Sequence, residues 1–163
     1  GPVLDVGCGS GDLAIHLAQR GLEAVGVDFV EEAIRQAQAR KAALPPAGAQ
    51  RLEFRVGDAL RPSLLGKRFG AVVDSGFYHL FDAEPCAGFV AELGRTLGPG
   101  GRCYLHEFAV TFPVPHVPRA VTEQELRQNF SRENGWRLVT VRPAGFLSAV
   151  APVPGILACA ERL

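Results

Sequence analysis

The sequence predicts an α/β fold, a three-layer sandwich in which helices cover a largely parallel sheet. Two observations support this prediction. Short apolar runs alternate with helical patterns along most of the chain, and the first run leads through a glycine-rich turn into a helix. The length of 163 residues suits one domain spanning 1–163, because too little chain follows the proline-rich stretch near residue 115 to build a second core.

The strands and helices follow from the spacing of apolar residues and from turn residues between them. We expect strands at 3–6, 23–28, 52–56, 69–74, 101–108, 136–141 and 156–160, the last two forming a hairpin-like antiparallel edge. We expect helices at 12–20, 30–44 and 86–97, the last ended by Gly98-Pro99-Gly100-Gly101. Thr122 and Glu125 form the capping box of a further helix.

Composition excludes several classes of protein. The chain is 47% hydrophobic and 21% charged, which is typical of a globular domain and excludes disorder. Lys plus Arg and Asp plus Glu both number 17, and this balance argues against a nucleic-acid partner. The four cysteines are scattered without a CxxC pair, which favours reduced thiols in the cytoplasm over disulfides or a metal site. We expect no membrane span and no signal peptide.

The most informative stretch is VLDVGCGSGD at residues 3–12. It contains a strand, then glycines at 7, 9 and 11, then the start of a helix. Glycines let the backbone turn tightly and approach a ligand, while a helix N-terminus offers free N–H groups. A tight turn without a ligand is the alternative explanation for this pattern alone.

Acidic residues end four successive predicted strands or follow them closely: Asp5, Asp28, Asp58 and Asp74. Because the carboxyl ends of parallel strands meet at one edge, we expect these carboxylates to share one crevice. A dinucleotide fingerprint would require glycine at position 12, where this chain has Asp12, and its pyrophosphate would be repelled by the acids. A ligand with ribose, adenine and a cationic centre suits them better, and S-adenosylmethionine has all three.

The segments VLDVGCGSGDLAIHLA, GVDF, GDA, VVDSGFYHLF and AELGRTLGPGGRCYLHEF resemble the successive motifs of class I S-adenosylmethionine-dependent methyltransferases. The resemblance covers residues 3 to about 142, and DSGFYHLF is similar to the small bacterial enzymes that act on small molecules. It implies a Rossmann-like sheet of seven strands, mostly parallel with one antiparallel strand. It also implies helices before the first strand. Here the first strand begins at residue 3, so we expect a truncated chain whose N-terminal lid helices are missing.

The resemblance also implies roles for individual residues. Gly7, Gly9 and Gly11 would line the methionine part of the cofactor, with Cys8 in the same loop and Asp5 beneath it. Asp28 would hold the ribose and Phe29 would pack on the adenine. Asp58 would accept from the adenine amino group beside the backbone N–H of Ala59, and Asp74 and Ser75 would meet the cofactor's amino group.

Candidates for catalysis are less distinct, because a sulfonium methyl is already activated and needs mainly alignment. His79 is the candidate base, since it follows the fourth strand and histidine titrates near neutrality. The alternative is that His79 only shapes the loop. Tyr78 would orient the substrate or simply pack. His106 and Glu107 face the same crevice by position, and an internal pairing of these two is the simpler interpretation.

We expect a small-molecule acceptor and no metal. After the fourth strand, DNA amino-methylating enzymes of this fold carry Asp or Asn followed by Pro-Pro and an aromatic residue, whereas this chain has Asp74-Ser75-Gly76-Phe77. Phe112, Pro113, Val114 and Val117 would form an apolar wall over the substrate or pack their loop onto the domain. Two other functions stay open at this point: a nicotinamide-dependent oxidoreductase, and a cofactor-binding domain without catalysis. The oligomeric state is not predicted.

Overall fold

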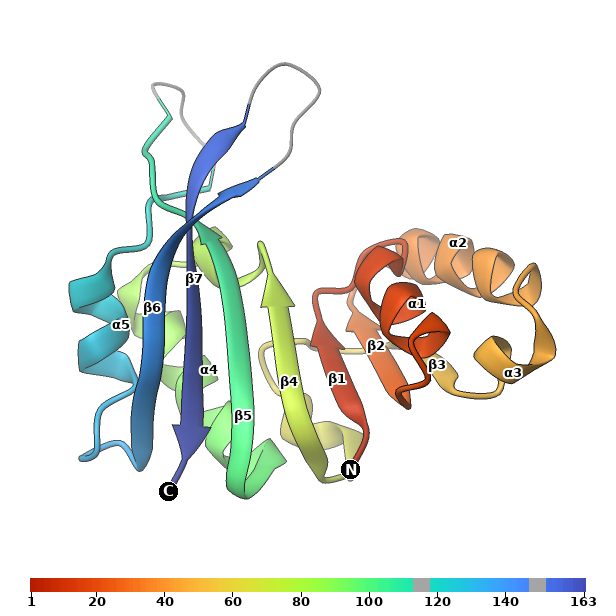
Figure 1. Cartoon of the computed structure of the whole chain (residues 1–163), viewed down its shortest axis with the longest axis horizontal. Coiled ribbons are helices and arrows are strands. Elements are labelled where there is room, and N and C mark those ends of the chain that lie inside the picture. The colour runs from red at the N-terminus through yellow and green to blue at the C-terminus, as the bar shows by residue number, and fades with distance from the viewer. Residues whose placement is uncertain (113–117, 147–151) are drawn as a thin grey trace.

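The computed structural model describes residues 1–112, 118–146 and 152–163 (Figure 1). The strands are β1 (Val3–Val6), β2 (Ala24–Asp28), β3 (Leu52–Val56), β4 (Phe69–Ser75), β5 (Leu97–Phe108), β6 (Trp136–Phe146) and β7 (Val153–Arg162). The α-helices are α1 (Asp12–Gln19), α2 (Glu31–Ala42), α3 (Pro46–Ala49), α4 (Ala83–Thr96) and α5 (Glu123–Asn129), and the 3₁₀ turns are η1 (Pro62–Leu65) and η2 (Tyr78–Leu80).

The seven strands form one mixed sheet in the order β3-β2-β1-β4-β5-β7-β6. The first five strands of the chain pair in parallel, and β7 runs antiparallel to both β5 and β6. The predicted Rossmann-like sheet with one antiparallel strand is therefore confirmed. Because β1, β2, β4 and β5 are parallel, their carboxyl ends open at the same edge of the sheet.

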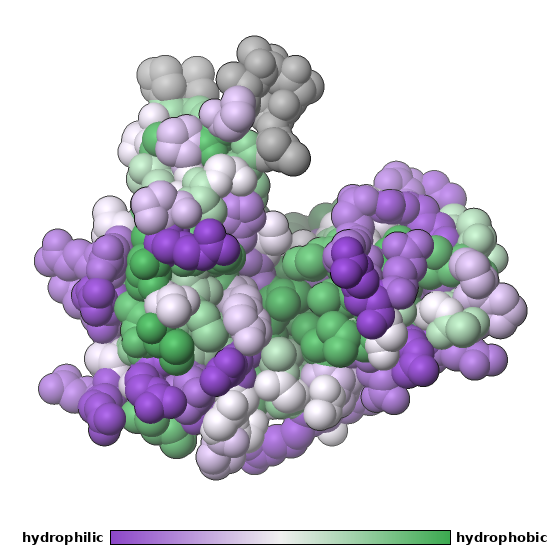
Figure 2. All heavy atoms as spheres, in the orientation of Figure 1, coloured by the Kyte–Doolittle hydropathy of each residue, from purple (hydrophilic) through white to green (hydrophobic). Residues whose placement is uncertain are grey.

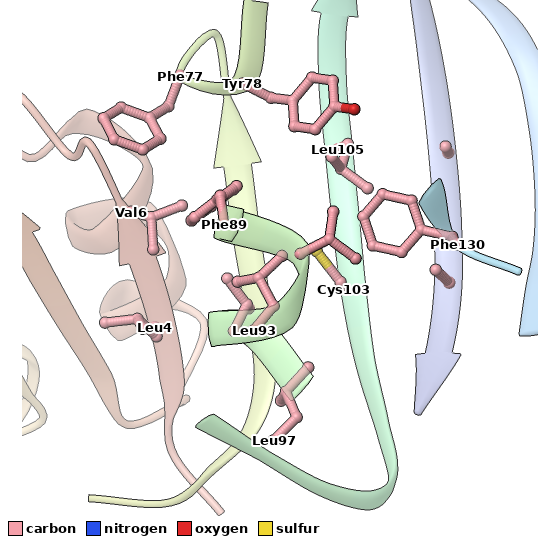
Figure 3. Close-up of a cluster of buried hydrophobic side chains, with 14 of the residues drawn as sticks. Leu4, Val6, Phe77, Tyr78, Phe89, Leu93, Leu97, Cys103, Leu105 and Phe130 are labelled. Atoms are coloured by element: carbon pink, nitrogen blue, oxygen red, sulfur yellow. The ribbon is translucent and has the colours of Figure 1, made fainter. Parts of the chain in front are cut away.

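The larger core lies between the sheet and helices α4 and α5. Phe89 and Leu93 of α4 point toward Leu4 and Val6 of β1 and toward Cys103 of β5 (Figure 3). Helix α5 adds Leu126 to the same cluster, followed by Phe130, whose ring meets Trp136 edge to face at 5.2 Å. This core fixes the positions of β1 and β4, which carry the predicted ligand-binding residues Asp5 and Asp74, and of the neighbouring β5.

On the opposite face, α1 and α2 pack on the β3-β2-β1 half of the sheet in a second cluster built from Ala14, Ile34 and Phe54. Figure 1 shows these helices over that half. In the same orientation, Figure 2 shows hydrophobic surface in the middle of the face, between the upright left half of the molecule and helix α1. Tyr104 of β5 and Val139 of β6 are more than a third exposed.

The structure differs from the expected elements mainly at their ends. Helix α4 begins at 83 and not at 86, after Asp82 in extended conformation, and β5 begins at 97 without an intervening loop. The glycine-rich run at 98–101 therefore does not separate α4 from β5 but is part of β5. The register of β5 against β4 shifts there, between Phe69 and Ala71 of β4. Strands β6 and β7 are longer than predicted, because each pairs with the other along its length. The short elements α3, η1 and η2 were not predicted.

The capping residue of α5 is as predicted, since Thr122 Oγ1 accepts the Glu125 amide at 3.1 Å. The box is not reciprocal, because the Glu125 carboxylate binds Arg119 at 2.6 Å. Among the described residues, no helix has the length and apolar character needed to cross a membrane. Cys8, Cys86, Cys103 and Cys159 are free thiols.

Candidate active site

The glycine loop between β1 and α1 is tied to the end of β2. The Gly9 amide donates to Asp28 Oδ2 at 2.9 Å, and the Val30 amide donates to Asp28 Oδ1 at the same distance. Asp28 is 8% exposed. Each carboxylate oxygen therefore has one backbone donor and keeps acceptor capacity for another. Two oxygens held in this way suit a pair of ligand hydroxyls.

Asp5 lies beneath the loop, as the resemblance implies. Its Oδ2 accepts the Ala14 amide of α1 at 3.0 Å, which joins the end of β1 to the helix. Burial, with smaller contributions from the charges of Asp74 and Asp28, raises the pKa of Asp5 to about 7. These charges show that the structure brings the three acids close together.

Asp74 lies at the carboxyl end of β4 and is buried. Its Oδ1 accepts the Phe77 amide at 2.9 Å and the Tyr78 amide at 3.4 Å, so it holds the turn that follows β4. Burial and the neighbouring Glu107 carboxyl raise the pKa of Asp74 well above its usual range. Ser75 is exposed at the same strand end.

The fourth predicted acid, Asp58, is arranged differently. It follows β3 at the same edge of the sheet, but it is exposed, and its carboxylate binds the Arg61 side chain at 2.7 Å and the Leu60 amide at 2.9 Å. Ala59 beside it is buried. The expected set of four converging carboxylates is therefore a buried group of three, with Asp58 at the surface and paired with an arginine.

The surface around the loop has room for a ligand. A Cβ added at Gly9 would meet no atom within 4 Å, whereas one at Gly7 would overlap the Phe77 ring and one at Gly11 the Phe54 ring. Gly7 and Gly11 thus face the protein, and Gly9 faces open space. The Phe29 side chain, directly after Asp28, is 70% exposed. The Asp28 carboxylate fits a ribose, the open space at Gly9 fits a polar chain, and the exposed Phe29 ring fits a base. Cys8 is half-buried in the same loop, and burial raises the pKa of its thiol.

His79 lies in η2 and is 4% exposed. Its Nδ1 is 2.9 Å from Glu107 Oε2, and the Phe108 amide lies 3.2 Å from the same nitrogen. The Cε1–Nε2 edge of the ring faces Gly76, where an added Cβ would be 3.3 Å from Cε1 and 3.5 Å from Nε2. Burial lowers the pKa of His79, so the imidazole is neutral at neutral pH.

Aromatic rings continue from His79 along the ends of β5 and β6. His79 stacks on Phe108 with ring centroids 4.5 Å apart, and His106 stacks on Phe146 at 3.8 Å. Phe112 meets Phe108 edge to face at 5.3 Å. We call Phe108, Phe112, Phe146 and His106 the aromatic cluster; all four residues are half-buried. Of the predicted apolar wall, only Phe112 is described; Pro113, Val114 and Val117 lie outside the described residues.

One sequence interpretation is corrected here. His106 and Glu107 do not face one crevice, because neighbouring strand residues point to opposite faces: Glu107 is buried toward α4 and bonds His79, while His106 joins the aromatic cluster. Tyr78 is fully buried, and its hydroxyl accepts from Asn129 Nδ2 of α5 at 2.6 Å. Of the two functions considered for Tyr78, this enclosure favours packing. Asn129 was not predicted, since it lies 51 residues away on a helix recognisable only by its cap.

A model of a methyltransferase domain family matches residues 3–101. The chain belongs to this methyltransferase domain family. A 2-heptyl-1-hydroxyquinolin-4(1H)-one methyltransferase of Mycobacteroides abscessus is 33% identical over 146 residues, 88% of this chain and 62% of that protein. A demethylmenaquinone methyltransferase of Deinococcus radiodurans is 41% identical over 110 residues, 65% of this chain and 42% of that protein. The domain thus spans less than two thirds of either relative. The oxidoreductase alternative is not favoured.

Solved structures share the fold. A magnesium protoporphyrin IX methyltransferase from Synechocystis, determined with S-adenosylmethionine bound, has a TM-score of 0.77 at 23% identity, over 99% of this chain and 70% of that one. A methyltransferase from Methanosarcina mazei gives 0.82 at 22% identity, over 99% of this chain and 92% of that one. The fold of this domain is therefore shared with these proteins at identities below 25%.

Proposed function

We propose that this methyltransferase domain transfers a methyl group from S-adenosylmethionine to a small-molecule acceptor. One observation supports this proposal most directly. The Gly9 amide donates to Asp28 at a point where the surface has room for a ligand, and the exposed Phe29 ring lies next to it. When bound, S-adenosylmethionine supplies an activated methyl group on a sulfonium. The residues of this chain bind it, orient the acceptor and exclude water, and orientation alone contributes about 7–11 kcal/mol in well-aligned reactions.

The binding roles follow from the contacts described above. Asp28 accepts from the ribose hydroxyls with its remaining lone pairs, and Phe29 offers its face to the adenine. Asp5 and Asp74 stand near the loop and hold the segments beside it, because their carboxyl groups accept the Ala14 and Phe77 amides. The Asp58 carboxylate is paired with Arg61, so it can bind the adenine amino group only while it also binds this arginine. We therefore assign Asp58 a weaker contribution to adenine binding than the neighbouring Ala59 amide, which donates to the adenine ring.

The aromatic cluster indicates the kind of acceptor. Its stacked rings, on half-buried residues, favour a flat conjugated molecule over a flexible amine. The relatives described above are named for methylating a hydroxyquinolone and demethylmenaquinone, both of which carry such rings. We therefore propose a planar hydroxylated ring as acceptor, with His79 accepting the hydroxyl proton because its imidazole is neutral near pH 7. The free thiols are consistent with action in the cytoplasm.

Calorimetry and turnover test this proposal. S-adenosylhomocysteine is expected to bind and NADH not to bind; the reverse would overturn the proposed cofactor. Methyl transfer from labelled S-adenosylmethionine is then measured with hydroxyquinolones, hydroquinones, alkyl amines and thiols. Transfer to the ring hydroxyls supports the proposal. Binding without transfer to any acceptor would favour the non-catalytic alternative.

A further inference from the structure

Two buried carboxyl groups lie side by side at the ends of β4 and β5. Asp74 is 2% exposed and Glu107 is 0% exposed. Asp74 is opposite Leu105 in the parallel register, and Glu107 is two residues further along β5, so both side chains project from the same face of the sheet. The resemblance implies a ligand-binding role for Asp74 and none for Glu107.

The hydrogen bonds of Asp74 and Glu107 indicate how many protons the two carboxyl groups carry. Among the described residues, Asp74 Oδ2 and Glu107 Oε1 are buried oxygens without a donor. The two side chains are nevertheless within hydrogen-bonding reach of each other. Two carboxylates have only acceptors, so they bond only when one of them carries a proton. One proton placed between these two oxygens satisfies both, and removes the repulsion between two buried charges.

The other oxygen of Glu107 faces His79. Glu107 Oε2 accepts the His79 amide at 3.1 Å and lies 2.9 Å from His79 Nδ1. When Glu107 is protonated, its hydroxyl and the Phe108 amide share the single lone pair of Nδ1, and the ring proton is on Nε2. When Glu107 is ionised, Nδ1 carries the proton and donates it to Oε2. The Phe108 amide then loses Nδ1 as its acceptor, and Nε2 has a free lone pair.

We propose that Glu107 is a positioning residue that sets the tautomer of His79, and that Asp74 is its protonated partner, so that His79 Nε2 is a base only when Glu107 is ionised. The role assigned to Nε2 rests on the proposed function; the shared proton and the tautomer do not. In the working state, Nε2 takes the proton lost by the acceptor hydroxyl and the ring becomes an imidazolium. The Glu107 carboxylate stabilises this cation, and the proton then leaves Nε2 for solvent.

The charged and titratable groups around Glu107 determine the pH at which it ionises. Asp74 approaches from β4, His79 from η2, and Arg119 from the segment before α5, where its amide donates to the His79 carbonyl at 3.1 Å. His106 lies on the other face of β5. Burial raises the pKa of Glu107 to about 7, while its hydrogen bonds and the charge of Arg119 oppose that rise. Deprotonation of Glu107 near neutrality is thus expected to free Nε2.

The test uses the Glu107→Gln variant, which keeps the shape and cannot ionise. Nitrogen-15 NMR of His79 in the ligand-free chain is expected to show the proton moving from Nε2 to Nδ1 as pH rises through about 7 in the wild type. In Glu107→Gln the amide N–H donates to Nδ1, so Nε2 is expected to stay protonated at all pH values. The control is Glu92→Gln, a largely buried glutamate of α4 that bonds Ser63, and it is expected to behave as wild type.

Infrared spectra supply a second readout. The wild type is expected to show the C=O stretch of a buried protonated carboxyl above the pH at which Glu107 ionises, and Asp74→Asn is expected to lose it. With an acceptor, kcat of Glu107→Gln should fall by about 100-fold while KM for S-adenosylmethionine changes by less than about twofold.

The outcomes separate this inference from the proposed function. The same His79 tautomer in wild type and Glu107→Gln, or no protonated carboxyl in the wild type, overturns the inference even if methyl transfer occurs. If Glu107→Gln does not fold, the wild-type titration and the infrared band decide alone. Failure of the wild type to bind S-adenosylhomocysteine overturns the proposed function, while the NMR and infrared results still decide the proton sharing.

Discussion

The amide of Gly9 donates to Asp28 Oδ2 at 2.9 Å, so the loop after β1 is held by the residue that ends β2. The second oxygen of the same carboxylate accepts the amide of Val30 at the start of α2. One buried side chain thereby orders two adjacent segments that come from different βα units. Loss of this carboxylate is expected to affect both the loop geometry and the contacts made to a ligand.

Asp28→Ala is expected to weaken binding of S-adenosylhomocysteine by about 1.5–3 kcal/mol, because charge-assisted hydrogen bonds are lost and the loop is released. Isothermal calorimetry measures the change. The matched control is Glu32→Ala, which removes a nearby surface acid paired with Arg35 and should leave the affinity unaltered. An unchanged dissociation constant in folded Asp28→Ala would count heavily against the assigned site.

Phe29→Ala is expected to raise the dissociation constant for S-adenosylhomocysteine by about 5- to 150-fold, from the loss of aromatic stacking worth about 1–3 kcal/mol. Its effect on the free energy of unfolding should be small, because the ring is 70% exposed. Leu64→Ala is the control, since Leu64 of η1 is equally exposed and apolar. Equal effects of the two substitutions on binding would remove Phe29 from the site.

Gly11→Ala tests how closely the loop packs on the sheet. Gly11 has φ +86°, and an added Cβ would overlap the Phe54 ring. Gly21 has nearly the same φ of +87° but open space around it, so Gly21→Ala isolates the backbone strain. We expect Gly21→Ala to cost about 1 kcal/mol of unfolding free energy and Gly11→Ala about 1–3 kcal/mol more, by urea denaturation. Equal costs would show that Phe54 moves aside freely.

Asp5→Asn tests the raised pKa of Asp5. The folded-state pKa of about 7 exceeds the usual value of 3.8 for an aspartate, so the folded chain binds the proton more tightly than the unfolded chain. This contribution is favourable at low pH and is lost as pH rises from about 4 to about 7. Asparagine can still accept the Ala14 amide without a charge. Asp5→Asn is therefore expected to match wild type at pH 4 and to be about 1–4 kcal/mol more stable at pH 8. A pH-independent difference would contradict the shift.

Much of the fold could be predicted because its first half consists of local patterns. β1, the glycine loop and α1 follow one another within 17 residues, and each has its own sequence signal. The start of β5 at Leu97 could not be predicted, because Gly98 to Gly101 read as a break and only pairing with β4 shows that the strand passes through them. The lengths of β6 and β7 were underestimated for a similar reason, since each depends on its partner.

The residues of the site also fall into those that could be predicted from local sequence and those that could not. The loop glycines, Asp28 and Asp74 lie directly at strand ends, so their placement could be expected from topology alone. The partner of Glu107 could not, because the direction of a strand side chain depends on the phase of the strand, and His79 reaches it from a 3₁₀ turn that was not predicted. Asp58 was expected to be free for a ligand, but Arg61 three residues later binds it.

Strand β7 is inserted between β5 and β6, although it is the last of the three to be synthesised. On the ribosome, β6 has no described strand neighbour to pair with until the residues up to 162 have emerged, and the hydrogen-bonding edge of β5 is exposed for the same period. The half of the sheet that carries Glu107 and the aromatic cluster can therefore assemble only after β7 has been synthesised. Synthesis of β7 is therefore expected to limit how soon the pairing of His79 with Glu107 can form in a newly made chain.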